Sequence, residues 1–224
     1  MLFLGIIGEE MLYYLDTKII EKNDYDLCIL HLPEDRKEKV SKYVFDKDKK
    51  CCVFGYILVK LGLAKEHGIR ENITFDYEKY GKPFLENYQD ISFNISHSGD
   101  GVICGISDKV VGVDIQEIIP YDKSIGEMIL SESEKEYLNS SENPDLTFTE
   151  LWTLKESYVK MLGIGIDNDL KRISFNLEKD SFYEYGKYFE KRIIDNYVIS
   201  YCSAESMEFY EVTREDLQAI MLAE

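Results

Sequence analysis

Two features of the sequence predict an α+β fold. Apolar residues recur at helical spacing over 46–65 and 147–162, and shorter runs such as 91–96 are typical of strands. Each half of the chain has the order strand, helix, strand, which places long helices against antiparallel strands. Pattern and charge both change between residues 108 and 109, so we expect two halves, 1–108 and 109–224.

The first half is expected to have the order strand, helix, strand. Pro33 favours a helix start, and Val53, Ile57 and Leu61 share one helical face. The predicted elements are strands at 2–7 and 25–31, helices at 34–44 and 46–65, a turn at 80–83 and a strand at 91–96.

The second half begins with a strong turn signal at Ser98-Gly99-Asp100-Gly101, and Gly163 marks the end of its longest helix. No internal repeat is visible. The predicted elements are a hairpin of strands 102–106 and 110–118 that turns at 107–109, helices at 122–130, 133–139 and 147–162, strands at 171–178, 182–190 and 194–203, and a short helix after Thr213.

Composition and charge restrict the possible partners. The 224 residues are 45% apolar, enough for a substantial core. The formal net charge of −17 opposes nucleic acid and anionic membranes as partners. The stretch 36–50 differs, because its seven basic and three acidic residues give a local charge of +4 that suits a polyanionic small ligand.

Cysteine usage and the first residues bear on the location of the protein. The five cysteines show no pairing pattern, which favours a reduced, cytoplasmic environment. Residues 1–8 lack the basic flank of a signal peptide. No apolar run is long enough to predict a membrane span.

Asp114 is a carboxylate in a strand whose other residues suit the core. Asp114 and Gln116 lie on one face of this strand, and Val113 and Ile115 lie on the other. A carboxylate that is buried needs a partner. On this segment alone, an exposed edge strand or an ion pair with a lysine explains Asp114 as well as a ligand site does.

The predicted helix 147–162 carries a second carboxylate. Trp152, Glu156 and Lys160 share one face at intervals of four residues. A surface ion pair between Glu156 and Lys160 is the ordinary explanation. The single tryptophan of the chain on the same face favours partial burial, and both charges then need partners.

These oxygen ligands suit a magnesium ion. Carboxylates from Asp114 and Glu156 and the amide oxygen of Gln116 are hard ligands, and Mg²⁺ commonly takes the remainder from phosphate and water. The three histidines lack the ligand spacing of a zinc site. We therefore expect Mg²⁺ beside bound phosphate.

Two turns carry side chains suited to phosphate oxygens. The turn after Ser96 and His97 offers hydroxyls, an imidazole and backbone amides. A serine hydrolase elbow needs glycine two residues before its serine, where this chain has Asn94. Lys82 sits in a rigid turn before Pro83. A turn-stabilising His97 and a solvated Lys82 remain alternatives.

Four motifs follow one another along the chain. They are Gly81-Lys82-Pro83, then Phe93-Asn94-Ile95-Ser96-His97-Ser98, then Val111-Gly112-Val113-Asp114-Ile115, and finally Trp152 with Lys155-Glu156-Ser157 and Lys160. In this order and at these separations they resemble the motifs of the Sfp-type 4′-phosphopantetheinyl transferases. The resemblance covers about residues 25–178.

The resemblance implies a fold and an activity. The fold would have two pseudo-symmetric halves, each a small antiparallel sheet packed with a long helix, and coenzyme A in the cleft between them. The activity would be a Mg²⁺-dependent transfer of the 4′-phosphopantetheine arm of coenzyme A to a serine of an apo acyl or peptidyl carrier protein, with release of adenosine 3′,5′-bisphosphate. The natural carrier could serve fatty-acid, polyketide or nonribosomal peptide assembly, and a monomer is expected.

The resemblance also implies roles for individual residues. The implied metal ligands are Asp114, Gln116 and Glu156. The implied catalytic residues are Glu156 and Lys160. The implied coenzyme A contacts are Arg36, Lys39, Lys50, Lys82, Ser96, His97 and Lys160. A carrier protein could dock on residues 120–145, where Met128, Ile129 and Leu130 are either an exposed contact or part of the core.

The chain departs from the family pattern at two places. Gln116 stands where many members carry an acid, so we expect weaker metal affinity. Cys51 and Cys52 stand where some members have Arg and Thr beside the adenosine phosphate. Gln116 leaves open the hypothesis that this chain is a catalytically weak coenzyme A-binding or regulatory relative that has lost the transfer activity. A Mg²⁺-dependent phosphohydrolase is a third, weaker hypothesis.

Overall fold

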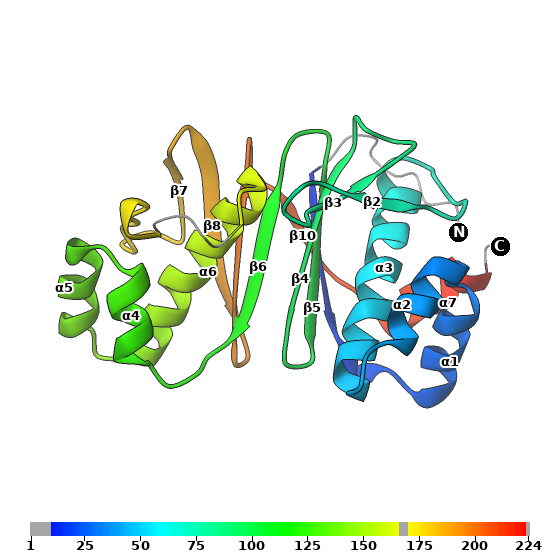
Figure 1. Ribbon diagram of the computed structural model, residues 1–224, viewed down its shortest axis with the longest axis horizontal. Coiled ribbons are helices and arrows are strands. Elements are labelled where there is room, and N and C mark those ends of the chain that lie inside the picture. Colours follow the sequence, from blue (N-terminus) through cyan, green and yellow to red (C-terminus); the bar gives the residue numbers. More distant parts are fainter. Residues whose placement is uncertain (1–9, 166–169, 223–224) are drawn as a thin grey trace.

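Helices flank two sheets that lie side by side in the middle of the molecule (Figure 1). The structure is a computed structural model that describes residues 10–165 and 170–222. Runs of helices and runs of strands follow one another along the chain and the strand pairs are mostly antiparallel, which confirms the predicted α+β class. Over the described residues, no helix combines the length and the apolar character needed to cross a membrane.

The strands fall into two groups along the chain. The earlier group is β1 (Met11–Asp16), β2 (Phe75–Tyr77), β3 (Pro83–Leu85), β4 (Ser92–Ser98), β5 (Gly101–Ser107) and β6 (Gly112–Glu117). The later group is β7 (Ser181–Glu184), β8 (Lys187–Ile194), β9 (Tyr197–Ser203) and β10 (Glu208–Glu211).

Most of the helices are found near their predicted positions. The α-helices are α1 (Lys22–Leu30), α2 (Glu34–Ser41), α3 (Asp46–Glu66), α4 (Lys123–Ile129), α5 (Glu132–Ser140), α6 (Pro144–Leu162) and α7 (Arg214–Leu222). Short 3₁₀ turns occupy Thr17–Ile19 and Leu170–Arg172.

The sheets have different strand orders. The first sheet runs β10-β1-β5-β4, in which only β1 and β10 are parallel. The second sheet runs β6-β9-β8-β7 and is antiparallel throughout. Strands β2 and β3 form a separate hairpin.

Three apolar cores hold the layers together. Helix α3 packs Phe54 and Ile57 against the first sheet, and α6 packs Leu151 and Leu154 against the second. A third core, which includes Val113 of β6, fills the space between the sheets. Each such buried side chain contributes roughly 1.5–3 kcal/mol to folding.

Strands β4 and β6 are neighbours although they belong to different sheets. Alternate side chains of β4 accept hydrogen bonds that the backbone of a neighbouring strand would otherwise accept. Ser92 Oγ accepts from Val111 N–H at 3.4 Å, and Asn94 Oδ1 accepts from Val113 N–H at 2.9 Å. Ser98 Oγ accepts from Glu117 N–H at 3.0 Å. These bonds satisfy donors on the edge of β6 that burial would otherwise leave unpaired.

Gly112 allows α6 to lie unusually close to β6. A Cβ atom at this position would come within 2.0 Å of the backbone oxygen of Ser157 and 2.4 Å of the backbone nitrogen of Met161. Because Gly112 and Asp114 share one face of β6, this close approach also brings the Asp114 side chain against α6.

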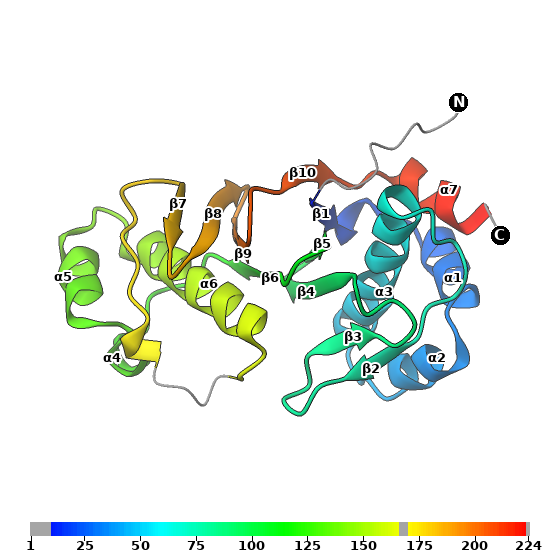
Figure 2. The same cartoon turned by 90° about the horizontal axis from the view of Figure 1, so that it is seen from above.

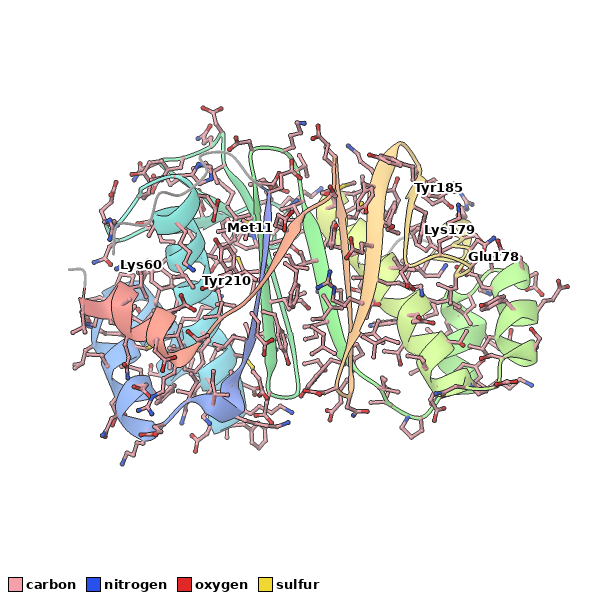
Figure 3. All side chains as sticks on the ribbon, turned by 180° about the vertical axis from the view of Figure 1, so that it is seen from behind. Met11, Lys60, Glu178, Lys179, Tyr185 and Tyr210 are labelled. Atoms are coloured by element: carbon pink, nitrogen blue, oxygen red, sulfur yellow. The ribbon has the colours of Figure 1, made fainter. Side chains whose placement is uncertain are left out.

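The end of the chain returns to the first half. Seen from behind, β10 crosses the molecule to lie beside β1, with Tyr210 and Met11 labelled (Figure 3). Arg214 of α7 pairs with Asp24 of α1 at 2.6 Å, and α7 also contacts α3. Strand β10 and helix α7 belong to the predicted second half but pack against elements of the first half. The predicted division of the chain at residue 108 stays a prediction.

The predictions that rest on helical periodicity are confirmed. Helices occur at the predicted 34–44, 46–65, 122–130, 133–139 and 147–162, and α7 follows Thr213. The longest of the later helices ends as expected, with Gly163 in the left-handed region at φ 66°.

Four strand predictions are wrong. The predicted strand 182–190 contains the turn between β7 and β8, which pair with each other. Residues 25–31 form most of α1, which starts where the Asp24 carboxylate accepts a hydrogen bond from Glu21 N–H. The segments 102–106 and 110–118 are strands but no hairpin, since β6 pairs with β9. No strand lies within 171–178, where a 3₁₀ turn occurs. The predicted strand 2–7 lies outside the described residues.

We predict that Gly112→Ala lowers the free energy of unfolding by about 3 kcal/mol, the upper part of the usual range for overpacking, because backbone atoms rather than a flexible side chain block the new methyl group. Urea unfolding measures the change. Gly55→Ala is the control, since its methyl group would meet only the Ile95 side chain, at 3.1 Å. Equal midpoints for both variants contradict the proposed close contact.

Candidate active site

A cavity of about 480 Å³ lies where β4, α6 and the β2–β3 hairpin meet. Its lining includes Lys82 from the hairpin, Asn94 from β4, and Glu156 and Lys160 from α6. Figure 2 shows the hairpin and the C-terminal end of α6 on the same side of the molecule. The cavity therefore gathers polar groups from segments that are far apart in sequence.

The two carboxylates predicted from sequence are both buried: Glu156 lines the cavity, and Asp114 lies beside it in contact with Lys160. Asp114 is 5% exposed and Glu156 is 6% exposed. One oxygen of each, Asp114 Oδ2 and Glu156 Oε1, is buried without a hydrogen-bond partner. Buried carboxylate oxygens without partners are costly, so this arrangement favours binding of a cation.

Lys160 and Ser96 hold the other oxygen of Asp114. The Lys160 Nζ atom lies 2.5 Å from Asp114 Oδ1, and Ser96 Oγ donates to the same oxygen at 2.7 Å. Lys160 Nζ also donates to Ser96 Oγ at 2.8 Å. The alternative of an exposed edge aspartate is therefore wrong, whereas the alternative of an ion pair with a lysine is correct for one oxygen of Asp114.

Burial and charge act on Glu156 together. Burial raises the pKa of the Glu156 carboxyl, the negative charge of Asp114 raises it further, and the Lys160 ammonium acts in the opposite direction. Lys160 donates to Asp114 and Ser96, and no ion pair with Glu156 occurs among the described residues. The alternative of a surface ion pair between Glu156 and Lys160 is therefore wrong for the described residues.

The residues present fit a divalent cation in part. The unpartnered oxygens of Asp114 and Glu156 supply two hard ligands. No group of three or more His, Cys, Asp or Glu side chains that could hold a metal occurs over residues 10–165 and 170–222. Half-buried Gln116 follows on β6, and its Nε2 donates to the backbone oxygen of Glu117 at 3.2 Å. A metal here would need further ligands from a bound molecule.

Lys82 lines the same cavity from the turn between β2 and β3. It comes from a tight turn in which Gly81 has φ 84°, and its Nζ donates to the backbone oxygen of Met161 at 2.8 Å. This bond satisfies a carbonyl in the last turn of α6, where a cation is favourable. Burial lowers the pKa of Lys82, and the Glu78 carboxylate opposes that shift.

A second hollow of about 420 Å³ adjoins the first and shares Gly81, Pro83 and Ile95 with it. It is lined by Arg36, Lys39, His97 and both Cys51 and Cys52, among others. Together the two hollows provide an extended groove with cations at both ends.

His97 and Lys50 have different surroundings. Burial of the imidazole and the nearby Lys160 ammonium lower the pKa of His97, although part of the ring is exposed. Lys50 does not join this group. It lines a separate hollow between α1, α2 and the start of α3.

Profiles of known families match both parts of the chain. The profile described as "4'-phosphopantetheinyl transferase superfamily" matches residues 110–202, and "4'-phosphopantetheinyl transferase, N-terminal" matches residues 20–108. The 4'-phosphopantetheinyl transferase gsp of Aneurinibacillus migulanus is 32% identical over 224 residues, which cover 94% of this chain and 93% of the relative. This chain is a 4′-phosphopantetheinyl transferase family member.

Other members of the transferase family are more distant. The 4'-phosphopantetheinyl transferase Sfp of Bacillus subtilis (strain 168) is 29% identical over 170 residues, which cover 75% of each chain. The human L-aminoadipate-semialdehyde dehydrogenase-phosphopantetheinyl transferase is 28% identical over 188 residues, which cover 76% of this chain and 60% of that protein.

The structure of this transferase also shows polar residues whose roles the sequence did not indicate. Asn94, considered only as a missing glycine, joins β4 to β6. Tyr77 accepts hydrogen bonds from both Arg36 and Lys39. Its position two residues after Phe75, just before the Gly81-Lys82-Pro83 turn, is a local signal of a hairpin side chain near that turn.

Lys155 of the fourth motif has a structural partner. Lys155 is fully buried, its Nζ lies 2.8 Å from Glu134 Oε2, and it donates to the backbone oxygens of Leu170 and Ile173. Glu134 Oε1 in turn accepts from the N–H of Phe175 at 3.0 Å. Lys155 thus joins α6 to α5 and to the segment before β7, and it supports the helix that carries Glu156.

We predict that Lys155→Met lowers the free energy of unfolding by about 3–5 kcal/mol, because it leaves the Glu134 carboxylate buried and unpaired. Adding Glu134→Gln should recover at least about 1 kcal/mol, since the remaining group is then neutral. Urea unfolding of both single variants and the double variant measures the coupling.

The control for this pair is Lys135→Met, which removes ion pairs between Lys135 and the exposed Glu127 and Glu132. Surface pairs of this kind contribute about 0–1 kcal/mol. A loss for Lys155→Met no larger than that of the control contradicts the structural role of Lys155.

Proposed function

We propose that the groove between β4, β6 and α6 is where this transferase moves the 4′-phosphopantetheine arm of coenzyme A to a serine hydroxyl of an apo carrier protein. The serine oxygen forms a bond to the phosphorus next to the arm, the diphosphate bond breaks, and adenosine 3′,5′-bisphosphate leaves. Membership in the transferase family supports the reaction, and the groove supplies the cations that a substrate with several phosphate groups needs.

The proposed cofactor is Mg²⁺, held by Asp114 and Glu156. The observation that carries this proposal is the pair of buried, unpartnered oxygens on these two residues. Diphosphate oxygens and water suit the remaining positions around Mg²⁺. When bound, Mg²⁺ supplies charge neutralisation for the diphosphate, which favours attack at phosphorus.

The lysines of the cavity are placed to act on the leaving group. Lys160 is already oriented by Asp114 and Ser96, and Lys82 is oriented by the end of α6. Ammonium groups that need no rearrangement stabilise charge that develops on the departing bisphosphate. We assign Lys160 to the reacting phosphate and Lys82, Ser96 and His97 to contacts with coenzyme A.

Glu156 is the proposed acceptor of the serine proton. Its raised pKa makes it a stronger base than an ordinary exposed carboxylate when it is ionised. The proton leaves the hydroxyl as the oxygen attacks phosphorus, and the buried carboxylate is close to where the diphosphate is proposed to lie. Glu156 would therefore serve both metal binding and proton transfer.

Gln116 occupies the third position of the proposed ligand set. A neutral amide in place of a carboxylate leaves the site with one negative charge less, which lowers the attraction for a divalent cation. The amide oxygen can still serve as a ligand after the side chain turns from its present contact with Glu117. We propose a functional site with reduced affinity for Mg²⁺.

The partner and the location are proposals of the same kind. The partner is an apo acyl or peptidyl carrier protein, and a monomeric enzyme in the cytoplasm is proposed; the five free cysteines support that location. Met128, with 72% exposure, is available for docking, whereas Ile129 and Leu130 are buried in the core.

We predict that Glu156→Gln lowers the rate of transfer by at least about a hundredfold, since it removes a metal ligand and the proposed base, and leaves coenzyme A binding within about threefold. The mass of an apo carrier after incubation with coenzyme A and Mg²⁺ measures transfer, and calorimetry measures binding. Glu178→Gln, a change at an exposed site, is the control.

The same assay tests the proposed function itself. A gain in mass of one phosphopantetheine arm on the carrier supports transfer by the unaltered chain. No gain, with coenzyme A still bound, favours a regulatory relative, and cleavage of coenzyme A without a carrier favours a phosphohydrolase. Transfer near the normal rate in Glu156→Gln overturns the assigned role of Glu156.

We predict that Gln116→Glu lowers the Mg²⁺ concentration needed for half-maximal transfer by about tenfold, because it adds a negative charge to the ligand set. The rise in melting temperature on adding Mg²⁺ checks this independently of activity. Gln89→Glu adds the same charge at an exposed position and should change neither quantity. An unchanged Mg²⁺ requirement contradicts a metal site next to residue 116.

A further inference from the structure

Arg36 is a buried cation whose charge has no counterpart in the described part of the chain. It is 6% exposed, and its guanidinium carbon lies 4.7 Å from the ring centre of Phe75 and 5.7 Å from that of Tyr56. Its Nε atom has no partner, and its Nη2 makes only a weak contact with Cys52 Sγ at 3.9 Å. A buried guanidinium in this condition favours an anion as ligand.

Lys39 lies one turn further along α2 and faces the same hollow. It makes no ion pair with a carboxylate among the described residues, and neither does Arg36. Instead, both cations converge on one neutral group. Arg36 Nη1 donates to the Tyr77 hydroxyl at 3.0 Å, and Lys39 Nζ donates to it at 3.1 Å.

The Tyr77 hydroxyl has one hydrogen-bonding capacity left. A phenol oxygen accepts through its lone pairs and donates one proton, and here two cations supply the bonds that it accepts. Its own proton has no acceptor among the described residues. Tyr77 is 43% exposed, so this proton is accessible from the hollow. Arg36, Lys39 and Tyr77 therefore present three donors to one volume.

The chemistry of coenzyme A indicates which group belongs there. Coenzyme A carries a diphosphate and a separate phosphate monoester on its ribose. The proposed function places the diphosphate in the adjoining cavity with Asp114 and Glu156, so the monoester is the remaining anionic group. The two hollows share Gly81 and Pro83, which allows one molecule to occupy both.

We propose that Tyr77 is a specificity residue that donates its hydroxyl proton to the ribose phosphate of coenzyme A and holds Arg36 and Lys39 in place around it. This inference rests on the proposed function. It assigns to this chain a preference for coenzyme A over dephospho-coenzyme A, which lacks that phosphate. Cys51 and Cys52 line the same hollow, and their neutral thiols offer no positive charge to a phosphate. The Tyr77 hydroxyl therefore contributes a larger share of phosphate binding.

Tyr77→Phe tests the assignment, because it removes the hydroxyl and keeps the ring over which Lys39 lies at 5.0 Å. Calorimetric titration of the full chain with coenzyme A, adenosine 3′,5′-bisphosphate and dephospho-coenzyme A measures the affinities. The Kd for the first two should rise about tenfold, and the Kd for dephospho-coenzyme A should change less than about twofold. Tyr183→Phe, at an exposed site, is the matched control.

The ratio of the two coenzyme A affinities separates binding from structure. If Tyr77 only supports the hairpin, Tyr77→Phe weakens the binding of all three ligands equally, and the ratio of the Kd for dephospho-coenzyme A to the Kd for coenzyme A stays the same. An unchanged ratio, with or without weaker binding, overturns the assignment and leaves the transferase proposal intact. A chain that prefers coenzyme A as expected, loses this preference in Tyr77→Phe, but transfers no arm to a carrier supports the assignment and overturns the proposed function.

Discussion

Strands β4 and β6 meet as the edges of two different sheets, and side chains rather than backbone groups join them. Asn94 and Ser98 accept from the backbone of β6, Ser92 accepts from the residue just before it, and the remaining residue of this alternating set, Ser96, donates to Asp114. The same row of side chains thus holds the sheets together and orients a carboxylate of the site. Helix α6 packs on the face of β6 that carries Gly112 and Asp114. The positions of Glu156 and Lys160, the proposed catalytic residues, therefore depend on this junction.

The groove contains buried charged groups that are costly in the free protein. Asp114 and Glu156 bury oxygens without partners, and Arg36 buries a guanidinium that pairs with no carboxylate among the described residues. Each arrangement costs free energy in the absence of ligand. In the proposed function, a cation bound to the acids and a phosphate bound to Arg36 would relieve both costs, which would make a net charge of −17 compatible with a strongly anionic substrate.

Elements that contain their own signal within one segment were predicted correctly. The helix from Pro144 to Leu162 follows from its periodicity and from Gly163, and the two carboxylates follow from polar residues in otherwise apolar elements. The strand predicted at 25–31 is a helix, because a short apolar run suits either element, and the strand predicted at 171–178 is absent although its apolar residues alternate. Tyr77 escaped notice because its hydroxyl gains meaning only beside Arg36 and Lys39, some 40 residues earlier.

By itself, the sequence determined most of the helices, the α+β class, the family and the residue types of the proposed site, because periodicity, capping and motif order are local properties of the chain. Only the tertiary structure decided that β6 pairs with β9 instead of β5, that Lys160 binds Asp114 instead of Glu156, and that Lys50 lies apart from Arg36. Those outcomes depend on which segments, distant in the sequence, lie next to the same strand edge or charged group. Packing of the whole chain determines these neighbours.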